Sequence, residues 1–205
     1  MLLFLDVISP IPEIFVIEDN KVILQRKIIS NASDKLSDNI FETYIKINKI
    51  LNLAQNLKKI ILTTGPGSYT SLRVGASFVS GLRLSKKILF CPLSVIDIMR
   101  FKGNKFNKDN MGVFIYSANN QKFFCKLSEN KKKVDYIKIE NENYILPEHI
   151  NTIFYNFREF ISNSENIKQY KFLFIDEIIQ NYQKLNFSIV HIIKPIYISN
   201  NNILN

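Results

Sequence analysis

The sequence of 205 residues has no tryptophan, two cysteines and two histidines, and this scarcity excludes several kinds of site. Cys91 and Cys125 have no CxxC spacing, so both are interpreted as reduced, buried thiols rather than as parts of a disulfide framework. His149 and His191 are far apart and lack the spacing of metal ligands. No Ser/His/Asp or Cys/His set is recognisable. The sequence therefore predicts no metal site and no catalytic residues.

Long hydrophobic runs are also missing. A membrane-spanning helix needs roughly 20 apolar residues, and the most apolar late stretch, residues 189–198, is broken by Lys194 and Pro195. The apolar start at residues 1–5 has no basic leader and meets Asp6 almost at once, unlike a signal peptide. We therefore expect a soluble, cytoplasmic protein with no membrane association.

Positive charge is in excess, with 27 Lys and Arg against 18 Asp and Glu and a net charge of +9. Such an excess can supply affinity for the phosphates of a nucleic acid, whatever its base sequence. However, most of it is Lys accompanied by many Asn and Ile, which is typical of an A+T-rich genome. The five arginines are dispersed, at Arg26, Arg73, Arg83, Arg100 and Arg158. The charge thus indicates either a nucleic-acid contact or compositional bias.

The first half of the chain is predicted to open with a strand meander. Its three strands are expected at residues 1–7, 14–17 and 22–29. Two later strands and two later helices are expected, the strands at 59–64 and 88–91 and the helices at 71–86 and 95–101. A polar, Lys/Asn-rich stretch at 103–110 suggests a boundary, giving domains of 1–103 and 104–205.

The helix after the meander carries more apolar surface than one buried face requires. Ser33 or Asp34 can cap it. Phe41 and Ile45 widen its apolar arc to roughly 220° at about 100° per residue, whereas core packing needs a stripe of about 100°. The central apolar face is formed by Leu36, Ile40, Tyr44, Ile47 and Leu51. One side of this helix is therefore expected to cover its own sheet and another to meet a partner.

The glycine-rich string GPGSYTSLRVG at residues 65–75 allows three interpretations. A glycine turn entering a helix can cradle a phosphate, but neither GxxxxGK[ST] nor a complete GxGxxG is present. A structural interpretation has Gly65 and Gly67 forming a tight turn, with Ser68 or Thr70 capping the helix. In the third, the small residues Ser71, Gly75 and Ala76 let another helix approach closely.

The second half is predicted to repeat the plan of the first. Strands are expected at 112–117, 122–128, 134–139 and 170–175, helices at 148–161 and 177–185, and an extended ending at 188–198. Each half then contains a strand meander, a helix, a strand and a helix. This duplicated plan resembles the actin-like (ASKHA, RNase H-like) architecture, so we expect a two-lobed α/β fold. We also expect its second lobe to be reduced.

The string at residues 65–75 resembles GPGSFTGLRIG, the signature of the bacterial TsaB (YeaZ) family. Phe4-Leu5-Asp6 resembles the family's first strand and Pro195-Ile196-Tyr197-Ile198 its closing motif. Tyr69 and Ser71 depart from the signature. The structural glycine motif implied by the resemblance comprises Gly65, Gly67, Ser68, Thr70 and Arg73.

The resemblance implies a non-catalytic subunit that binds and activates a TsaD-type catalytic subunit and joins a TsaE-type ATPase. The complex would form N6-threonylcarbamoyladenosine at position 37 of ANN-decoding tRNAs, and tRNA would be met only through the complex. No cofactor is expected, although the sequence leaves open whether a nucleotide binds at the subunit interface. The expected partner interface comprises Leu36, Ile40, Phe41, Tyr44, Ile45, Ser71, Leu72, Gly75, Ala76 and Val79.

Catalysis by the chain alone is not expected. The catalytic relative has an HxxxH pair that is missing here, and nucleotide hydrolysis in actin-like folds needs cleft carboxylates that hold Mg²⁺. Asp6 is the one first-lobe candidate, and residues 116–121 lack the family's Asp-Ala-Arg…Glu string. The alternatives are a free-standing ATPase or kinase of the same fold, or a basic RNA-binding module. Within the complex, Lys131, Lys132 and Lys133 are candidates for contact with tRNA. A homodimer in isolation is also open.

Overall fold

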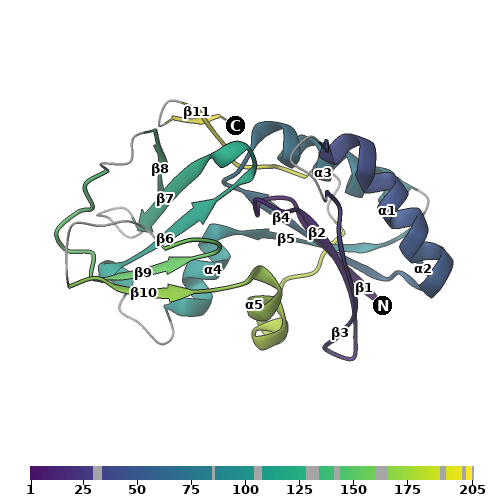
Figure 1. Ribbon diagram of the computed structural model, residues 1–205. Helices are drawn as coiled ribbons and strands as arrows, with labels where there is room; N and C mark the ends of the chain where they lie inside the picture. The colour runs from purple at the N-terminus through teal and green to yellow at the C-terminus, as the bar shows by residue number, and fades with distance from the viewer. Residues whose placement is uncertain are drawn as a thin grey trace.

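The computed structural model describes residues 1–29, 34–84, 86–103, 108–127, 134–140, 144–159, 166–189, 193–199 and 202–204. Its strands form two five-stranded mixed sheets and a small hairpin. In Figure 1 the first sheet lies on the right beneath two long helices, and the second lies on the left. The chain therefore has two lobes, as the sequence predicted.

The first sheet has the order β3-β2-β1-β4-β5. β1 pairs antiparallel with β2 and parallel with β4, which pairs parallel with β5. The strands are β1 (Leu2–Asp6), β2 (Glu13–Glu18), β3 (Lys21–Lys27), β4 (Lys59–Gly65) and β5 (Leu89–Ser94). All five side chains of β1 are buried, as expected for a central strand covered on both faces.

The second sheet repeats this arrangement, with the order β10-β9-β6-β7-β8. Here β6 takes the place of β1, because it pairs antiparallel with β7 and parallel with β9. The strands are β6 (Met111–Tyr116), β7 (Lys122–Leu127), β8 (Val134–Ile139), β9 (Thr152–Tyr155) and β10 (Lys168–Lys171). Each lobe is thus one antiparallel meander extended by two parallel strands.

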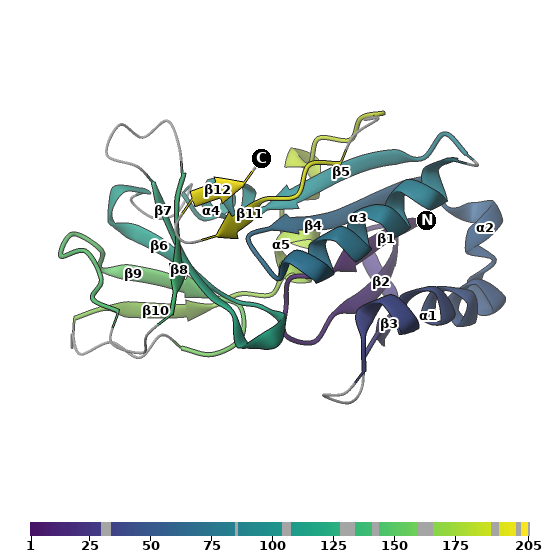
Figure 2. The same cartoon turned by 90° about the horizontal axis from the view of Figure 1, so that it is seen from above.

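Helices cover the first lobe more fully than the second. α1 (Leu36–Leu51) and α3 (Tyr69–Leu84) lie side by side on one face of the first sheet, and the short α2 (Leu53–Asn56) follows α1 (Figure 2). α4 (Val95–Lys102) leads toward the second sheet, and α5 (Phe174–Gln180) follows β10. Short 3₁₀ turns occupy η1 (Lys108–Asn110), η2 (Ala118–Asn120) and η3 (Tyr182–Lys184).

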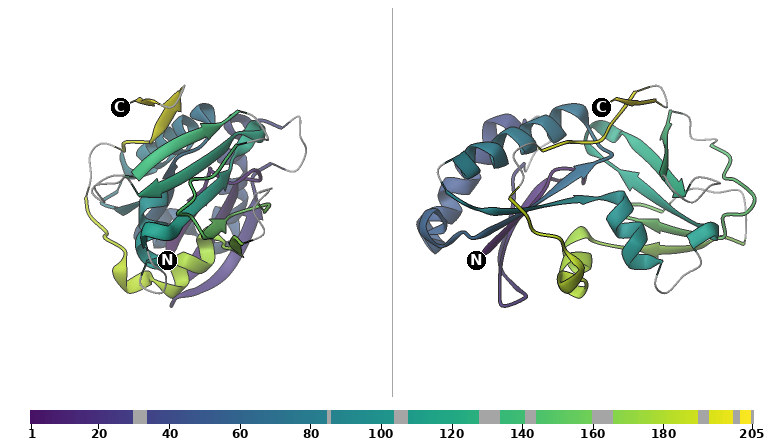
Figure 3. Two further views of the ribbon diagram at one scale, coloured as in Figure 1. Left: turned by 90° about the vertical axis from the view of Figure 1, so that its left-hand side faces the viewer. Right: turned by 180° about the vertical axis from the view of Figure 1, so that it is seen from behind.

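The end of the chain runs back across both lobes. Ser188 pairs with Phe90 at the edge of β5, and the hairpin β11 (Tyr197–Ser199) and β12 (Asn202–Leu204) follows. Figure 3 shows this yellow segment passing from α5 along the first sheet toward β11. One buried apolar cluster includes Leu3 and Ile61 from the first sheet and Val113 and Phe154 from the second, so the lobes share a core.

The largest error of the sequence prediction is the helix expected at 148–161. Residues 152–155 form β9, buried on both sides between β6 and β10. A short, fully buried strand has no alternation to distinguish it from part of a buried helix. Strand β10 and helix α5 also start earlier than predicted, so residues 174 and 175 are helical rather than extended.

Two predictions of helix starts are also corrected. α1 begins at Leu36 with Lys35 as its N-cap residue and without a side-chain capping bond from Lys35, so Asp34 lies one residue before the N-cap position expected for it. α3 begins at Tyr69, which leaves Ser68 just before the helix and places Thr70 in its first turn. Ser33, Lys131, Lys132, Lys133 and His191 lie outside the described residues, as do residues 104–107 at the expected domain boundary.

Candidate functional site

The glycine loop between β4 and α3 is filled by the chain's own closing segment. Gly65 has φ of 122°, and a Cβ there would lie 2.7 Å from the carbonyl oxygen of Ile196. The Ile196 N–H donates to the carbonyl oxygen of Thr64 at 2.7 Å. Gly65 is therefore required both by its backbone angle and by the close approach of residue 196.

The next residues of the loop connect the two lobes. The Ser68 N–H donates to the Oγ of Ser117, at the end of β6, at 2.9 Å. A Cβ on Gly67 would lie 3.1 Å from the same Oγ and 3.3 Å from Ile8. The backbone donor that could have held a phosphate is thus used by a side chain of the second lobe, which favours the structural interpretation of the motif.

An aromatic and cationic cluster lies at the start of α3. Tyr69 is half exposed, and its ring lies 4.7 Å from that of Tyr197. The Arg73 guanidinium lies 5.1 Å from the Tyr69 ring centroid and donates to the Tyr69 hydroxyl at 3.1 Å. Arg73 thus holds the first turn of α3 together, while Tyr197 attaches the closing segment to it.

Most of the predicted partner interface is buried within the chain. Gly75 packs on the sheet, where an added Cβ would meet Val7 at 2.9 Å and Leu62 at 3.1 Å. The small-residue face of α3 therefore lets the helix approach its own sheet, and it does not form a groove open to another helix. Buried with Gly75 are Leu36, Ile40, Tyr44, Ser71, Leu72 and Val79.

The accessible remainder of that interface lies along α1 and α3. Phe41 is 62% exposed, and Ile45 and Ala76 are partly buried. Tyr44 of α1 packs edge-on against Phe78 of α3, with ring centroids 5.6 Å apart, so the two helices form one surface. A large aromatic side chain left exposed on a helix pair is a candidate anchor for another protein.

Asp6 lies in a cleft of about 570 Å³ between the first-lobe meander and the segment of α5. Its Oδ1 accepts hydrogen bonds from the Ile8 and Ser9 N–H groups and from Thr63 Oγ1, at 3.0, 3.2 and 3.2 Å. Its Oδ2 accepts from Ser9 Oγ at 2.6 Å. Burial raises the pKa of Asp6, and these hydrogen bonds oppose the rise. The carboxylate holds the loop after β1, and a metal ion would have to displace those donors.

The second-lobe loop after β6 carries amides instead of carboxylates. Asn119 and Asn120 have φ of 60° and 55° and are exposed, while Ser117 is buried against the glycine loop. Asn residues tolerate this left-handed backbone better than most. The described part of the chain contains no group of three or more His, Cys, Asp and Glu side chains that could hold a metal ion, and His149 is exposed.

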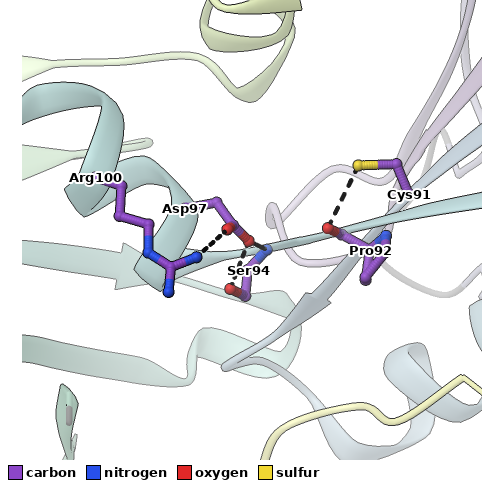
Figure 4. A network of polar contacts seen from close by, with 5 residues as sticks. All are labelled: Cys91, Pro92, Ser94, Asp97 and Arg100. Atoms are coloured by element: carbon purple, nitrogen blue, oxygen red, sulfur yellow. Dashed lines mark hydrogen bonds and ion pairs between the residues drawn. The ribbon is translucent and has the colours of Figure 1, made fainter. Parts of the chain in front are cut away.

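Cys91 lies beside the capped start of α4 (Figure 4). The Ser94 N–H and hydroxyl both donate to Asp97 Oδ2, at 2.9 and 2.8 Å, and Arg100 pairs with Oδ1 at 3.4 Å. Burial, together with the charge of Asp97, raises the pKa of Cys91 to about 12. The raised pKa disfavours the thiolate, which is the nucleophilic form of cysteine. Cys125 is also buried, as predicted.

The sequence did not reveal which residues fill the glycine loop. Ser117 and Ile196 reach it from positions that are remote in the chain, and neither carries a motif that points to this contact. The only available signal was the glycines themselves, because a glycine-rich tight turn suggests a close approach without identifying the neighbour.

The duplicated sheets, the first-lobe helix pair and the filled glycine loop define a two-lobed α/β protein of the actin-like class. Structural comparison agrees with this class. YeaZ from Pseudomonas aeruginosa superposes with a TM-score of 0.59 at 12% identity, covering 96% of this chain and 99% of that one. A second structure, described as an uncharacterized protein similar to peptidase YEAZ from Pseudomonas aeruginosa, gives 0.59 at 11% identity, covering 96% and 98%.

Sequence comparison supplies the family. The family model described as "TsaD: tRNA N6-adenosine threonylcarbamoyltransferase" matches residues 23–191. The tRNA threonylcarbamoyladenosine biosynthesis protein TsaB of Buchnera aphidicola subsp. Acyrthosiphon pisum (strain APS) is 28% identical over 103 residues, which are 48% of this chain and 47% of that protein. The chain belongs to this family, in its TsaB/YeaZ branch. The match spans about half the length of the curated relative.

Proposed function

We propose that this chain is a non-catalytic subunit that binds and activates a TsaD-type transferase in a complex forming N6-threonylcarbamoyladenosine on tRNA. A TsaE-type ATPase would be the third member, and the chain itself would need no cofactor. Family membership supports the pathway, since a relative in the same branch is named for threonylcarbamoyladenosine biosynthesis.

The observation that carries the non-catalytic part of the proposal is the occupied glycine loop. Ile196 fills the space at Gly65, and Ser117 takes the Ser68 N–H. An enzyme of this class needs donors and carboxylates directed at a phosphate-bound metal ion. Here the Asp6 carboxylate accepts hydrogen bonds from the loop that follows β1, and the second-lobe loop has Asn119 and Asn120 instead of carboxylates.

For the docking surface we propose the exposed faces of α1 and α3, centred on Phe41 and flanked by Ile45 and Ala76. Phe41 keeps most of its ring in water although α1 already buries a complete face on the sheet. Removing a large aromatic side chain from water is among the strongest contributions to protein association.

The test is co-purification of the chain with its cognate TsaD-type protein. Phe41→Gln should weaken that complex about tenfold or more, as for an interface hot spot. Ile50→Gln is the matched control, because Ile50 is also 62% exposed on α1 and nine residues at about 100° each place it on the opposite side. Neither change should lower the free energy of unfolding by more than about 0.5 kcal/mol.

Depletion of the chain in its host, followed by analysis of tRNA nucleosides, tests the pathway separately. Loss of threonylcarbamoyladenosine is the expected result. Unchanged nucleosides would refute the proposal. Tight Mg·ATP binding and turnover by the isolated chain would instead establish the alternative of a free-standing ATPase. Sedimentation of the isolated chain tests whether the same helix face forms a homodimer, which Phe41→Gln should then dissociate.

A further inference from the structure

Several segments meet at the end of the first lobe that lies away from the second lobe. α2, the last turn of α1 and the region between α3 and β5 lie at this end in Figure 2. The Leu89 N–H donates to the carbonyl oxygen of Lys58 at 3.0 Å, and Lys86 Nζ contacts the carbonyl oxygen of Ala54. These contacts bring residues 49–58 and 86–89 into one surface.

This surface carries exposed lysines without compensating acids. Lys49, Lys58, Lys86 and Lys87 are all exposed, and among the described residues none of them forms an ion pair. Residues 43–60 and 82–92 contain no Asp or Glu. We call these four lysines the cationic end.

The nearest acids lie at one side of the cationic end. Leu2 is paired with Ile17 and with Lys59, so Glu18 and Asp19 of the β2–β3 turn are at the same end of the sheet. β1 separates β2 from β4, which places that turn about 10 Å away from the start of β4. Lys21 stands beside these two acids. The positive field at α2 and the start of β5 is therefore not cancelled locally.

Helix stabilisation explains only part of the cluster. A Lys in the last turn of a helix offsets the negative end of the helix dipole, and Lys49 has that position in α1. Lys58, Lys86 and Lys87 lie outside the helices. The helix dipole therefore does not explain why these three lysines lie together at one end of the lobe.

We propose that the cationic end binds the phosphates of a folded RNA, with tRNA as the probe. Lys side chains, together with the exposed amides of Asn52, Gln55 and Asn56 beside them, are the residue types that contact phosphate and sugar. A membrane surface would require an apolar stripe, and Ile50 and Leu84 are the only exposed large apolar side chains in the described parts of residues 43–60 and 82–92. This surface is separate from the docking face at Phe41.

The experiment measures tRNA affinity of the full chain, alone and with its partner, as a function of salt. The charge-neutralising variant carries Lys49→Gln, Lys58→Gln, Lys86→Gln and Lys87→Gln. The slope of log affinity against log salt should fall in magnitude by about 3, because each phosphate contact contributes roughly 0.7 to 0.9. The control carries the same change at four other exposed lysines, Lys21, Lys27, Lys35 and Lys168, and should change the slope by less than about 1.

Equal losses in both variants would show that net charge alone attracts tRNA and would overturn the proposal. It would also fail if the wild type bound vesicles containing phosphatidylglycerol but not tRNA. A variant with Arg at the same four positions should retain the affinity. Because co-elution with the TsaD-type partner is measured on the same samples, a failure of RNA binding is distinguishable from a failure of the proposed docking.

Discussion

At the scale of residues, the three glycines of the 65–75 motif each lie close to a different part of the fold. Gly65 meets the backbone of Ile196, Gly67 meets the hydroxyl of Ser117, and Gly75 meets the side chains of Val7 and Leu62. The first two contacts connect the motif to the closing segment and to the second lobe. The motif is therefore a structural junction, and its glycines are explained without a bound phosphate.

Gly65→Ala should lower the free energy of unfolding by at least about 1–3 kcal/mol, the usual cost of a non-glycine residue in a disfavoured backbone region. The contact with a backbone oxygen adds to that cost, since the oxygen cannot move aside easily. Gly81→Ala is the control, because an added Cβ at this position of α3 has nothing within 4 Å. It should instead stabilise the helix by about 0.5–1 kcal/mol. Urea unfolding of both variants measures the difference. Equal effects would contradict the structural role of Gly65.

At the scale of elements, β9 shows how context overrides periodicity. Ile150, Ile153, Phe154 and Phe157 have helical spacing, yet Ile153 and Phe154 are adjacent and both buried in β9, while Phe157 is 38% exposed. β9 is flanked by the parallel strands β6 and β10, and its two faces pack into different apolar clusters, Ile153 into one and Phe154 into the other. No local pattern in the sequence carries that information.

A pair of truncations checks the assignment of β9 as a strand. Ile153→Ala should cost about 2–5 kcal/mol, because a fully buried aliphatic side chain is removed. Phe157→Ala should cost clearly less, because the ring is already partly in water. In a helix at 148–161 the two positions would be about 40° apart on one face and would cost similar amounts. Denaturant midpoints with constant m-values measure both changes.

Local patterns were sufficient for much of the remaining fold. The two meanders and α1, α3 and α4 were predicted within a few residues, because alternation and helical spacing act over short distances. Which residues of the proposed docking face are exposed was predicted only in part, since spacing shows that a helix is apolar on two sides but does not show which side meets the sheet. Phe41 and Tyr44 both belong to the apolar arc of α1, yet Phe41 is 62% exposed and Tyr44 is buried.

At the scale of the whole molecule, a buried ion pair connects the lobes. Lys102, at the end of α4, contacts Glu177 of α5 at 2.5 Å, with side chains 18% and 4% exposed. The same ammonium lies 5.1 Å from the ring centroid of Phe154 in β9. The Ser68–Ser117 hydrogen bond is a second polar contact between the lobes.

Lys102→Met should destabilise the protein by about 3–5 kcal/mol, because it leaves the Glu177 carboxylate buried without its partner. The double variant Lys102→Met with Glu177→Leu should recover most of that loss, since two apolar groups can replace a buried pair at little cost. Urea denaturation of the single and double variants gives the comparison. If the double variant is as unstable as the single one, packing rather than charge explains the site.

The crossing of the closing segment also has a consequence for synthesis on the ribosome. The first sheet is complete in sequence by residue 94, but the glycine loop and the edge of β5 are covered only by residues 188 and 196. While the ribosomal tunnel still holds those residues, the emerging first lobe has an uncovered loop and an unpaired strand edge. Such an edge is exposed to wrong pairing until residue 188 reaches it.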